Sequence, residues 1–336
     1  MKLDQLYSLR RNFTIIGLTG RTGSGCTTIA QLLSGTFEDL EQKRLRNPED
    51  FEDKVFSRKY KICKNYLSHP GNWTRFQTIK YVNVLLFFIV HRYGGNIEQT
   101  QELLSKFFRN DRHDDNSERV GKVIEKIRFI HKKYRKLIVR VKKLPQFSEL
   151  RSEGDLLDLN ELFFEVAYNS LVGDMLEALE SEGYYRTRVM LHRVACNIRA
   201  TGDPLKDSLG SVDHVYSIAN LINKLIKARR AFNRKSNSPT KIVIDSLRNS
   251  LEIMYFKQRF SAFYMIVTKD VLRNAESRVN KRLELKIQDS TERKTTVTDL
   301  MALDAIEYRT KDFSRGTFSS PDVEIAFKRA TIIFLT

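Results

Sequence analysis

A glycine-rich stretch between an apolar run and an amphipathic run constrains this chain more than any other feature. Residues 13–18 are apolar and partly β-branched, which predicts a short buried strand. Gly20, Gly23 and Gly25 follow, and Cys26 opens a run with apolar residues at helical spacing. A strand, a glycine loop and a helix in this order form the context that a phosphate-binding loop requires. The simpler interpretation is a strand-to-helix turn that binds no ligand.

The loop matches the phosphate-binding pattern G-x-x-x-x-G-K-[ST] except at one position. Gly20, Gly25 and Thr27 fit the pattern, but Cys26 stands in place of the lysine. Glycines let backbone N–H groups converge on an anion, the helix N-terminus adds partial positive charge, and the Thr27 hydroxyl can ligate Mg²⁺. A lysine would neutralise the β- and γ-phosphates, whereas a Cys26 thiolate would repel them. The loop therefore predicts phosphate binding without efficient phosphoryl transfer.

Composition favours an anionic partner. The 336 residues carry a net charge of +17, which suits nucleotides, nucleic acid or a phosphate-rich surface. The alternative is a basic surface that is merely solvated. The three cysteines are too few and too scattered for a disulfide framework or a zinc site, which indicates a reducing cytoplasm. The most apolar run, residues 82–90, is too short to span a membrane, so no membrane partner is expected.

Short apolar runs and helical periodicity predict the rest of the secondary structure. Further strands are expected at 76–82, 241–245, 263–267 and 330–335. Long helices are expected at 120–143, 156–179, 184–200, 215–231 and 269–283. The polar residues 288–320, with charges of both signs, are expected to form a mobile segment or lid. The helix at 120–143 carries ten basic residues, which predicts contact with a nucleic-acid backbone or, alternatively, a solvated face that pairs with the acids of 149–165.

The order of these elements predicts an α/β fold with a parallel P-loop sheet, helices on both faces and a large all-helical insertion. The P-loop domain is expected to comprise residues 1–93 and 240–336, and the helical insertion residues 94–239.

Four segments together resemble the nucleoside monophosphate kinase and dephospho-CoA kinase branch of P-loop NTPases. They are GLTGRTGSGCTT at 17–28, FQTIKYVNVLLFFI at 76–89, LHRVACNIRATGDPL at 191–205 and the run that starts with KIVIDSLRNSLEIMYF at 241–278. With the C-terminal PDVEIAFKRATIIFLT, the arrangement also resembles the N-terminal P-loop module of bacterial anti-phage deoxycytidylate deaminases. This resemblance implies ATP or a deoxynucleotide and Mg²⁺ as ligands. It also implies a downstream effector domain or a partner protein. A zinc deaminase domain follows the last strand in those deaminases, but this sequence has no H-x-E or P-C-x-x-C motif.

The predicted nucleotide-binding residues are Gly20, Arg21, Thr22, Gly23, Ser24, Gly25, Cys26, Thr27, Thr28 and Arg199. Arg199 ends a predicted helix, where the resemblance places an acceptor phosphate. Asp245 ends a predicted strand and suits Mg²⁺ together with Thr27, and Asp245 and Arg248 are the catalytic candidates. A strand-end cap and surface charges are the alternatives. Three arginines of one predicted helix are candidates for a clamp on the lid side: Arg273, Arg278 and Arg282.

Three functions are compatible with this sequence. The first is a nucleotide-sensing module that regulates an effector or partner in phage defence, favoured by Cys26. The second is a (deoxy)nucleotide kinase that uses ATP, with a substitute cation at Arg21 or on the lid. The third is a nucleic-acid-binding protein that uses the basic helix at 120–143, favoured by the charge of the chain.

Overall fold

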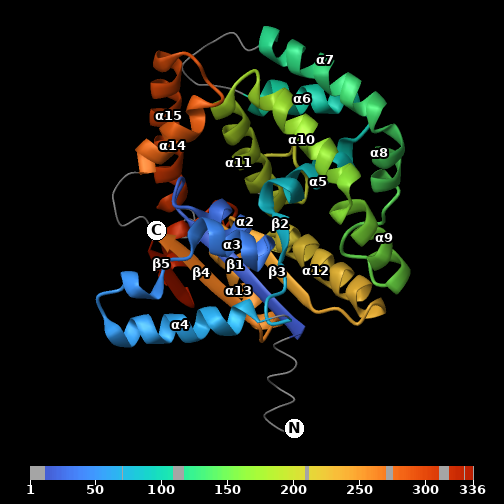
Figure 1. Cartoon of the computed structure of the whole chain (residues 1–336). Coiled ribbons are helices and arrows are strands. Elements are labelled where there is room, and N and C mark those ends of the chain that lie inside the picture. Colours follow the sequence, from blue (N-terminus) through green and yellow to red (C-terminus); the bar gives the residue numbers. More distant parts are fainter. Residues whose placement is uncertain are drawn as a thin grey trace.

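The computed structural model describes residues 12–69, 71–108, 117–208, 212–269, 275–309, 318–328 and 330–335. A five-stranded parallel sheet forms the centre of this part of the chain, with the strand order β2-β3-β1-β4-β5 (Figure 1). The strands are β1 (Phe13–Gly20), β2 (Gln77–Lys80), β3 (Thr240–Asp245), β4 (Phe263–Lys269) and β5 (Ile332–Leu335). The predicted strands are confirmed, as are the α/β class and the parallel pairing, except that the strand expected at 76–82 ends at Lys80, where Tyr81 begins a helix.

Side chains along each strand point alternately to the two faces of the sheet, and apolar side chains lie on both faces. On β1, Ile15 belongs to the main core, whereas Leu18 packs with Cys26 and Ala30 of helix α2 on the opposite face. The helix α2 (Cys26–Ser34) covers that second face. The main-core face is covered by α5 (Tyr81–Tyr93), α12 (Ser217–Lys235), α13 (Ser250–Arg259) and α16 (Val323–Lys328).

Most of the other helices lie between β2 and β3 in the chain. They are α6 (Ile97–Phe107), α7 (Ser117–Lys133), α8 (Arg135–Lys142), α9 (Glu153–Phe164), α10 (Val166–Glu180) and α11 (Tyr184–Thr201). Their buried side chains join those of the sheet in one continuous core. Helices α3 (Phe37–Arg44) and α4 (Lys54–Ser68) follow α2. Among the described helices, none is long and apolar enough to cross a membrane.

Two helices that were predicted to be continuous are broken. The helix expected at 120–143 ends at Lys133 and resumes at Arg135, and the hydroxyl of Tyr134 donates to Asp174 of α10 (3.0 Å). This bend lets α7 pack on α6 and α10 while α8 packs on α5 and α9. A straight amphipathic helix presents one apolar stripe along its length, so the break lets α8 turn its apolar face in a different direction from that of α7.

The helix expected at 156–179 is broken at Glu165, whose backbone is extended (φ −73°, ψ 159°). Phe163 and Tyr168 both pack edge-on against Phe87, with ring centroids 5.5 and 5.2 Å from it. Residues five apart on a straight helix point in different directions, so the break brings both rings to one partner.

The lid expected at 288–320 is largely a helix, α15 (Ser290–Tyr308), and residues 310–317 lie outside the described part of the chain. Asp289 caps this helix by accepting a hydrogen bond from the N–H of Glu292 (2.6 Å). Helix α15 pairs with α14 (Ala275–Glu284), and both stand next to α11 (Figure 1, orange and olive). This helix was not predicted, because acidic residues interrupt the apolar periodicity of α15 although they face inward.

Candidate functional site

The glycine loop connects β1 to α2 at the carboxyl end of the sheet. Gly23 and Gly25 have positive φ angles of 82° and 98°, which L-amino acids with a side chain rarely adopt. The strands on both sides of β1 also end here, with Asp245 on β3 and Thr268 near the end of β4. Ligands of parallel α/β sheets bind at this edge, in the crevice beyond the strand ends.

Gly20 is required by a close approach between β1 and β4. A Cβ atom on Gly20 would lie 2.2 Å from both Ser24 Oγ and Thr268 Oγ1. These two hydroxyl oxygens are themselves 2.6 Å apart and buried. The loop is therefore fastened to β4 directly beneath Gly20, which fixes the path of its backbone.

Cys26 lies beneath the loop, and only 8% of its surface is exposed. Its Sγ is 3.1 Å from Thr268 Oγ1, so the side chain belongs to the same buried contact. Burial raises the pKa of the Cys26 thiol, with hydrogen bonds to Thr268 working in the opposite direction. The thiol is neutral near pH 7. Repulsion of phosphate by a Cys26 thiolate therefore does not arise near pH 7, although the position still supplies no positive charge.

A cavity of about 1590 Å³ opens above the loop. The sequence-predicted residues that line it are Gly20, Arg21, Thr22, Gly23, Ser24, Gly25, Cys26, Thr27, Thr28, Arg199, Asp245 and Arg248. The fold thus brings together all of them, although Arg199 comes from the helical region. Arg278 and Arg282 of α14 also line the cavity, whereas Arg273 lies outside the described residues.

Asp245 and Thr27 are the residues with which the site could hold Mg²⁺. Asp245 ends β3, is 6% exposed, and accepts a hydrogen bond from Ser246 Oγ (2.8 Å). Mg²⁺ is usually held by one or two protein oxygens, with water and phosphate oxygens completing its octahedron. One carboxylate and one hydroxyl on the same cavity fit that donor set. The described residues contain no group of three or more His, Cys, Asp or Glu suited to an all-protein metal site.

Arg248 lies against the glycine loop. Its Nη2 donates to Thr22 Oγ1 (3.3 Å), and its Nη1 forms an ion pair with Glu307 of α15. Arg248 and Asp245 line the same cavity as Cys26. The structure thus places Arg248, one of the two catalytic candidates, beside the glycine loop.

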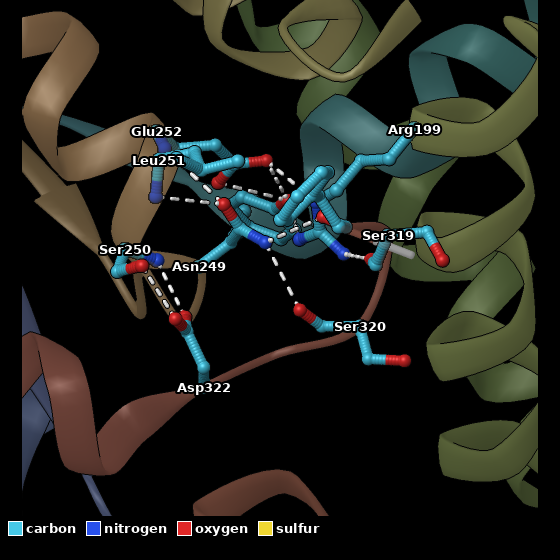
Figure 2. Close-up of polar contacts among 10 residues, drawn as sticks. Arg199, Asn249, Ser250, Leu251, Glu252, Ser319, Ser320 and Asp322 are labelled. Carbon is cyan, nitrogen blue, oxygen red and sulfur yellow. Dashed lines mark hydrogen bonds and ion pairs between the residues drawn. The ribbon is translucent and has the colours of Figure 1, made fainter. Parts of the chain in front are cut away.

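Arg199 is held in a buried network (Figure 2). Its Nε donates to Glu252 Oε1 (2.9 Å), its Nη1 to the carbonyl of Ser319 (2.7 Å) and its Nη2 to the Tyr81 hydroxyl (2.6 Å). The attraction of Glu252 raises the pKa of Arg199 in spite of desolvation, which acts to lower it. Arg199 lines the cavity, but each of its three guanidinium nitrogens donates a hydrogen bond within the protein.

The same network fastens the segment before α16 to the start of α13. Asn249 accepts from the N–H groups of Leu251 and Glu252 and donates to the carbonyl of Ser320 (2.9 Å). Asp322 accepts from the backbone N–H and the hydroxyl of Ser250, as Figure 2 also shows. Burial raises the pKa of Asp322 to about 6.

Sequence reasoning missed the acids of α15 that reach the loop. Asp304 Oδ2 is 2.7 Å from Arg21 Nε, and Asp304 Oδ1 accepts from the backbone N–H of Thr22 (2.6 Å). Glu307 contacts Arg248 and also lies 2.8 Å from His192 Nδ1. The available signal was the spacing of three residues between Asp304 and Glu307, which places both on one face of a helix.

The basic helices α7 and α8 use several of their charges within the protein. Ion pairs join Lys122 to Glu118, Lys126 to Glu182, Lys133 to Asp174 and Arg140 to Glu161. The expected pairing with the acids of 149–165 is confirmed for Arg140. These pairs reduce the number of cations that a nucleic-acid backbone could use.

Comparisons of the chain with family models, with curated proteins and with solved structures found no match.

Proposed function

We propose that this chain is a nucleotide-binding module of the P-loop kind, with the sheet of the nucleoside monophosphate kinases and a helical insertion. The phosphates of a nucleoside di- or triphosphate would lie on the loop from Gly20 to Thr28. The observation that carries the proposal is the glycine loop at the end of the central strand, because it opens a helix N-terminus onto a cavity of about 1590 Å³. That volume exceeds the range of about 300–1,000 Å³ typical of small-molecule pockets.

Regulation rather than catalysis is the role that the loop favours. Phosphoryl transfer depends almost wholly on positioning and electrostatic stabilisation, and the lysine that normally supplies charge at the β- and γ-phosphates is replaced by the neutral, buried Cys26. We propose that the bound (deoxy)nucleotide is sensed and that its presence controls an effector domain or a partner protein. A role in phage defence rests on the resemblance to the deaminase modules alone.

A thermal-shift panel of ribo- and deoxyribonucleotides, with and without Mg²⁺, tests binding and identifies the base and sugar. A ligand that binds only the native state stabilises it by about 2.7 kcal/mol at a concentration one hundred times its Kd. We expect at least one di- or triphosphate to raise the melting temperature, and the rise to depend on Mg²⁺. A panel in which no nucleotide shifts the melting temperature at millimolar concentration would contradict the proposal.

A nucleotide kinase is the second candidate, favoured by the size of the cavity and by Arg278 and Arg282 on its wall. A single-turnover assay with labelled ATP, Mg²⁺ and each monophosphate in turn separates the two functions. Turnover of about 1 s⁻¹, the lower end of the kinase range, would favour the kinase. Trace product with clear binding would favour the sensor.

A further inference from the structure

Helix α15 presents two carboxylates to the cationic groups of the glycine loop. Asp304, with 3% of its side chain exposed, receives hydrogen bonds from the backbone N–H of Thr22 (2.6 Å) and from Arg21 Nε (2.7 Å). One turn later, Glu307 holds the guanidinium of Arg248. Helix α15 therefore pairs with both arginines that reach the loop and with one of the loop's own N–H groups.

The donors that hold these carboxylates are the donors that a phosphate requires. Backbone N–H groups of a glycine loop and planar guanidinium groups bind carboxylates and phosphates through the same charge-assisted hydrogen bonds. A hydrogen atom that points at Asp304 Oδ1 cannot also point at a phosphate oxygen. In addition, two buried carboxylates beside the loop repel a polyanion.

We propose that Asp304 and Glu307 occupy phosphate positions of the glycine loop, and that a nucleotide binds by displacing them from Arg21, Thr22 and Arg248. This inference rests on the proposed nucleotide binding. Arg248, once released by Glu307, supplies the positive charge that Cys26 does not provide. The movement of α15 away from the loop is then the signal that reports the presence of a nucleotide.

The packing of α15 suits such a movement. Together with α14 it forms a small cluster of its own with the start of α11, made up of Tyr184, Val279, Leu283, Val297 and Leu300. This cluster is separate from the main core that joins the sheet to the helical region. The α14–α15 pair can therefore shift as a unit without opening the main core, as lids and other low-stability units do.

The first test measures the affinity of the full chain for ATP and for inorganic tripolyphosphate by titration calorimetry. Asp304→Asn keeps the size of the side chain but removes its charge, and Glu307→Gln does the same one turn later. Each substitution is expected to tighten binding by at least about tenfold. In the parent, every new hydrogen bond to phosphate requires that a hydrogen bond to a charged carboxylate be broken, whereas in the variants the broken bond is to a neutral amide. Arg248→Met is expected to weaken binding by a similar factor.

Asp299→Asn is the matched control. Asp299 is a buried acid of the same helix, with 4% exposure, but it does not line the cavity. This variant is expected to bind both ligands with the affinity of the parent. Equal tightening in Asp299→Asn would show that any loss of a buried acid loosens α15, and the specific displacement would be refuted.

The second test uses the unaltered chain and so does not depend on the folding of a variant. Hydrogen exchange of the peptides that cover residues 290–308 is measured with and without saturating ATP. Exchange is expected to rise severalfold on binding, because α15 leaves the loop. Unchanged exchange, or equal affinities of the parent and both acid variants, would overturn the displacement while leaving nucleotide binding intact. If no nucleotide of the thermal-shift panel binds either the parent or Asp304→Asn, the proposed function fails with it.

Discussion

Replacing Arg199 by methionine should destabilise the fold strongly. The side chains of Arg199 and Glu252 are 1% and 0% exposed and form an ion pair at 2.9 Å. Methionine fills a similar volume but leaves the Glu252 carboxylate buried without its counter-charge. Removing one partner of a buried pair typically costs about 3–5 kcal/mol. The Tyr81 hydroxyl still donates to Glu252 (2.9 Å), so we expect the lower end, about 3 kcal/mol.

Urea unfolding followed by circular dichroism measures this loss as a lower midpoint at an unchanged slope. Arg199→Met/Glu252→Met should recover most of the stability, because replacing both members of a buried pair by apolar residues is often neutral. Arg193→Met, on the exposed side of the same helix, should stay within about 0.5 kcal/mol of the parent. If Arg199→Met instead unfolds like the parent but loses nucleotide affinity, Arg199 is a ligand-binding residue, and its structural role is refuted.

Three further substitutions test the loop and its surroundings. Gly20→Ala should destabilise the chain by about 1–3 kcal/mol, because its Cβ would overlap the hydroxyl groups of Ser24 and Thr268; a melting curve equal to that of the parent would contradict the close approach. Cys26→Lys should strengthen triphosphate binding by roughly 1.5–3 kcal/mol, because a lysine adds a second cation to that of Arg248, and an unchanged affinity in calorimetry would show that a side chain at this position does not reach the phosphates. The pKa of Asp322 is about 6 in the folded protein, against an ordinary 3.8. The protonated side chain therefore stabilises the fold fully below pH 3.8, and this stabilisation is lost as the pH rises through 6. Asp322→Asn should remove about 3 kcal/mol of this pH dependence, and urea midpoints at pH 4 and 7 that change as much in the variant as in the parent would argue against it.

The sheet was predictable from the sequence because its strands are short apolar runs buried on both faces, a pattern typical of parallel sheets. The glycine loop was also predictable, since positive φ angles and close approaches select glycine. The burial of Cys26, which raises the pKa of its thiol further, was not predictable, because it comes from packing against Thr268, which is 242 residues away in the chain.

The acids of the site could not be placed from the sequence for a related reason. In the sequence, Asp304 and Glu307 are typical of the polar surface of a mobile segment. They are nevertheless buried, because Arg21 and Arg248, which are 283 and 59 residues away in the chain, compensate their charges. Arg199 was expected to face a ligand, whereas its three nitrogens donate to Glu252, Ser319 and Tyr81, which are 53, 120 and 118 residues away in the chain. Pairing between distant charges leaves no periodic pattern from which it could be inferred.

The most direct test of nucleotide binding at the loop compares Gly25→Val with Gly95→Val. Both glycines have positive φ, 98° and 83°, so both substitutions strain the backbone. Gly95, however, lies outside the cavity, and a Cβ atom on it would meet no other atom within 4 Å. Calorimetric titration of the tightest nucleotide from the thermal-shift panel should give parental affinity for Gly95→Val and no measurable binding for a folded Gly25→Val. Parental affinity in both variants would place the nucleotide elsewhere and contradict the account.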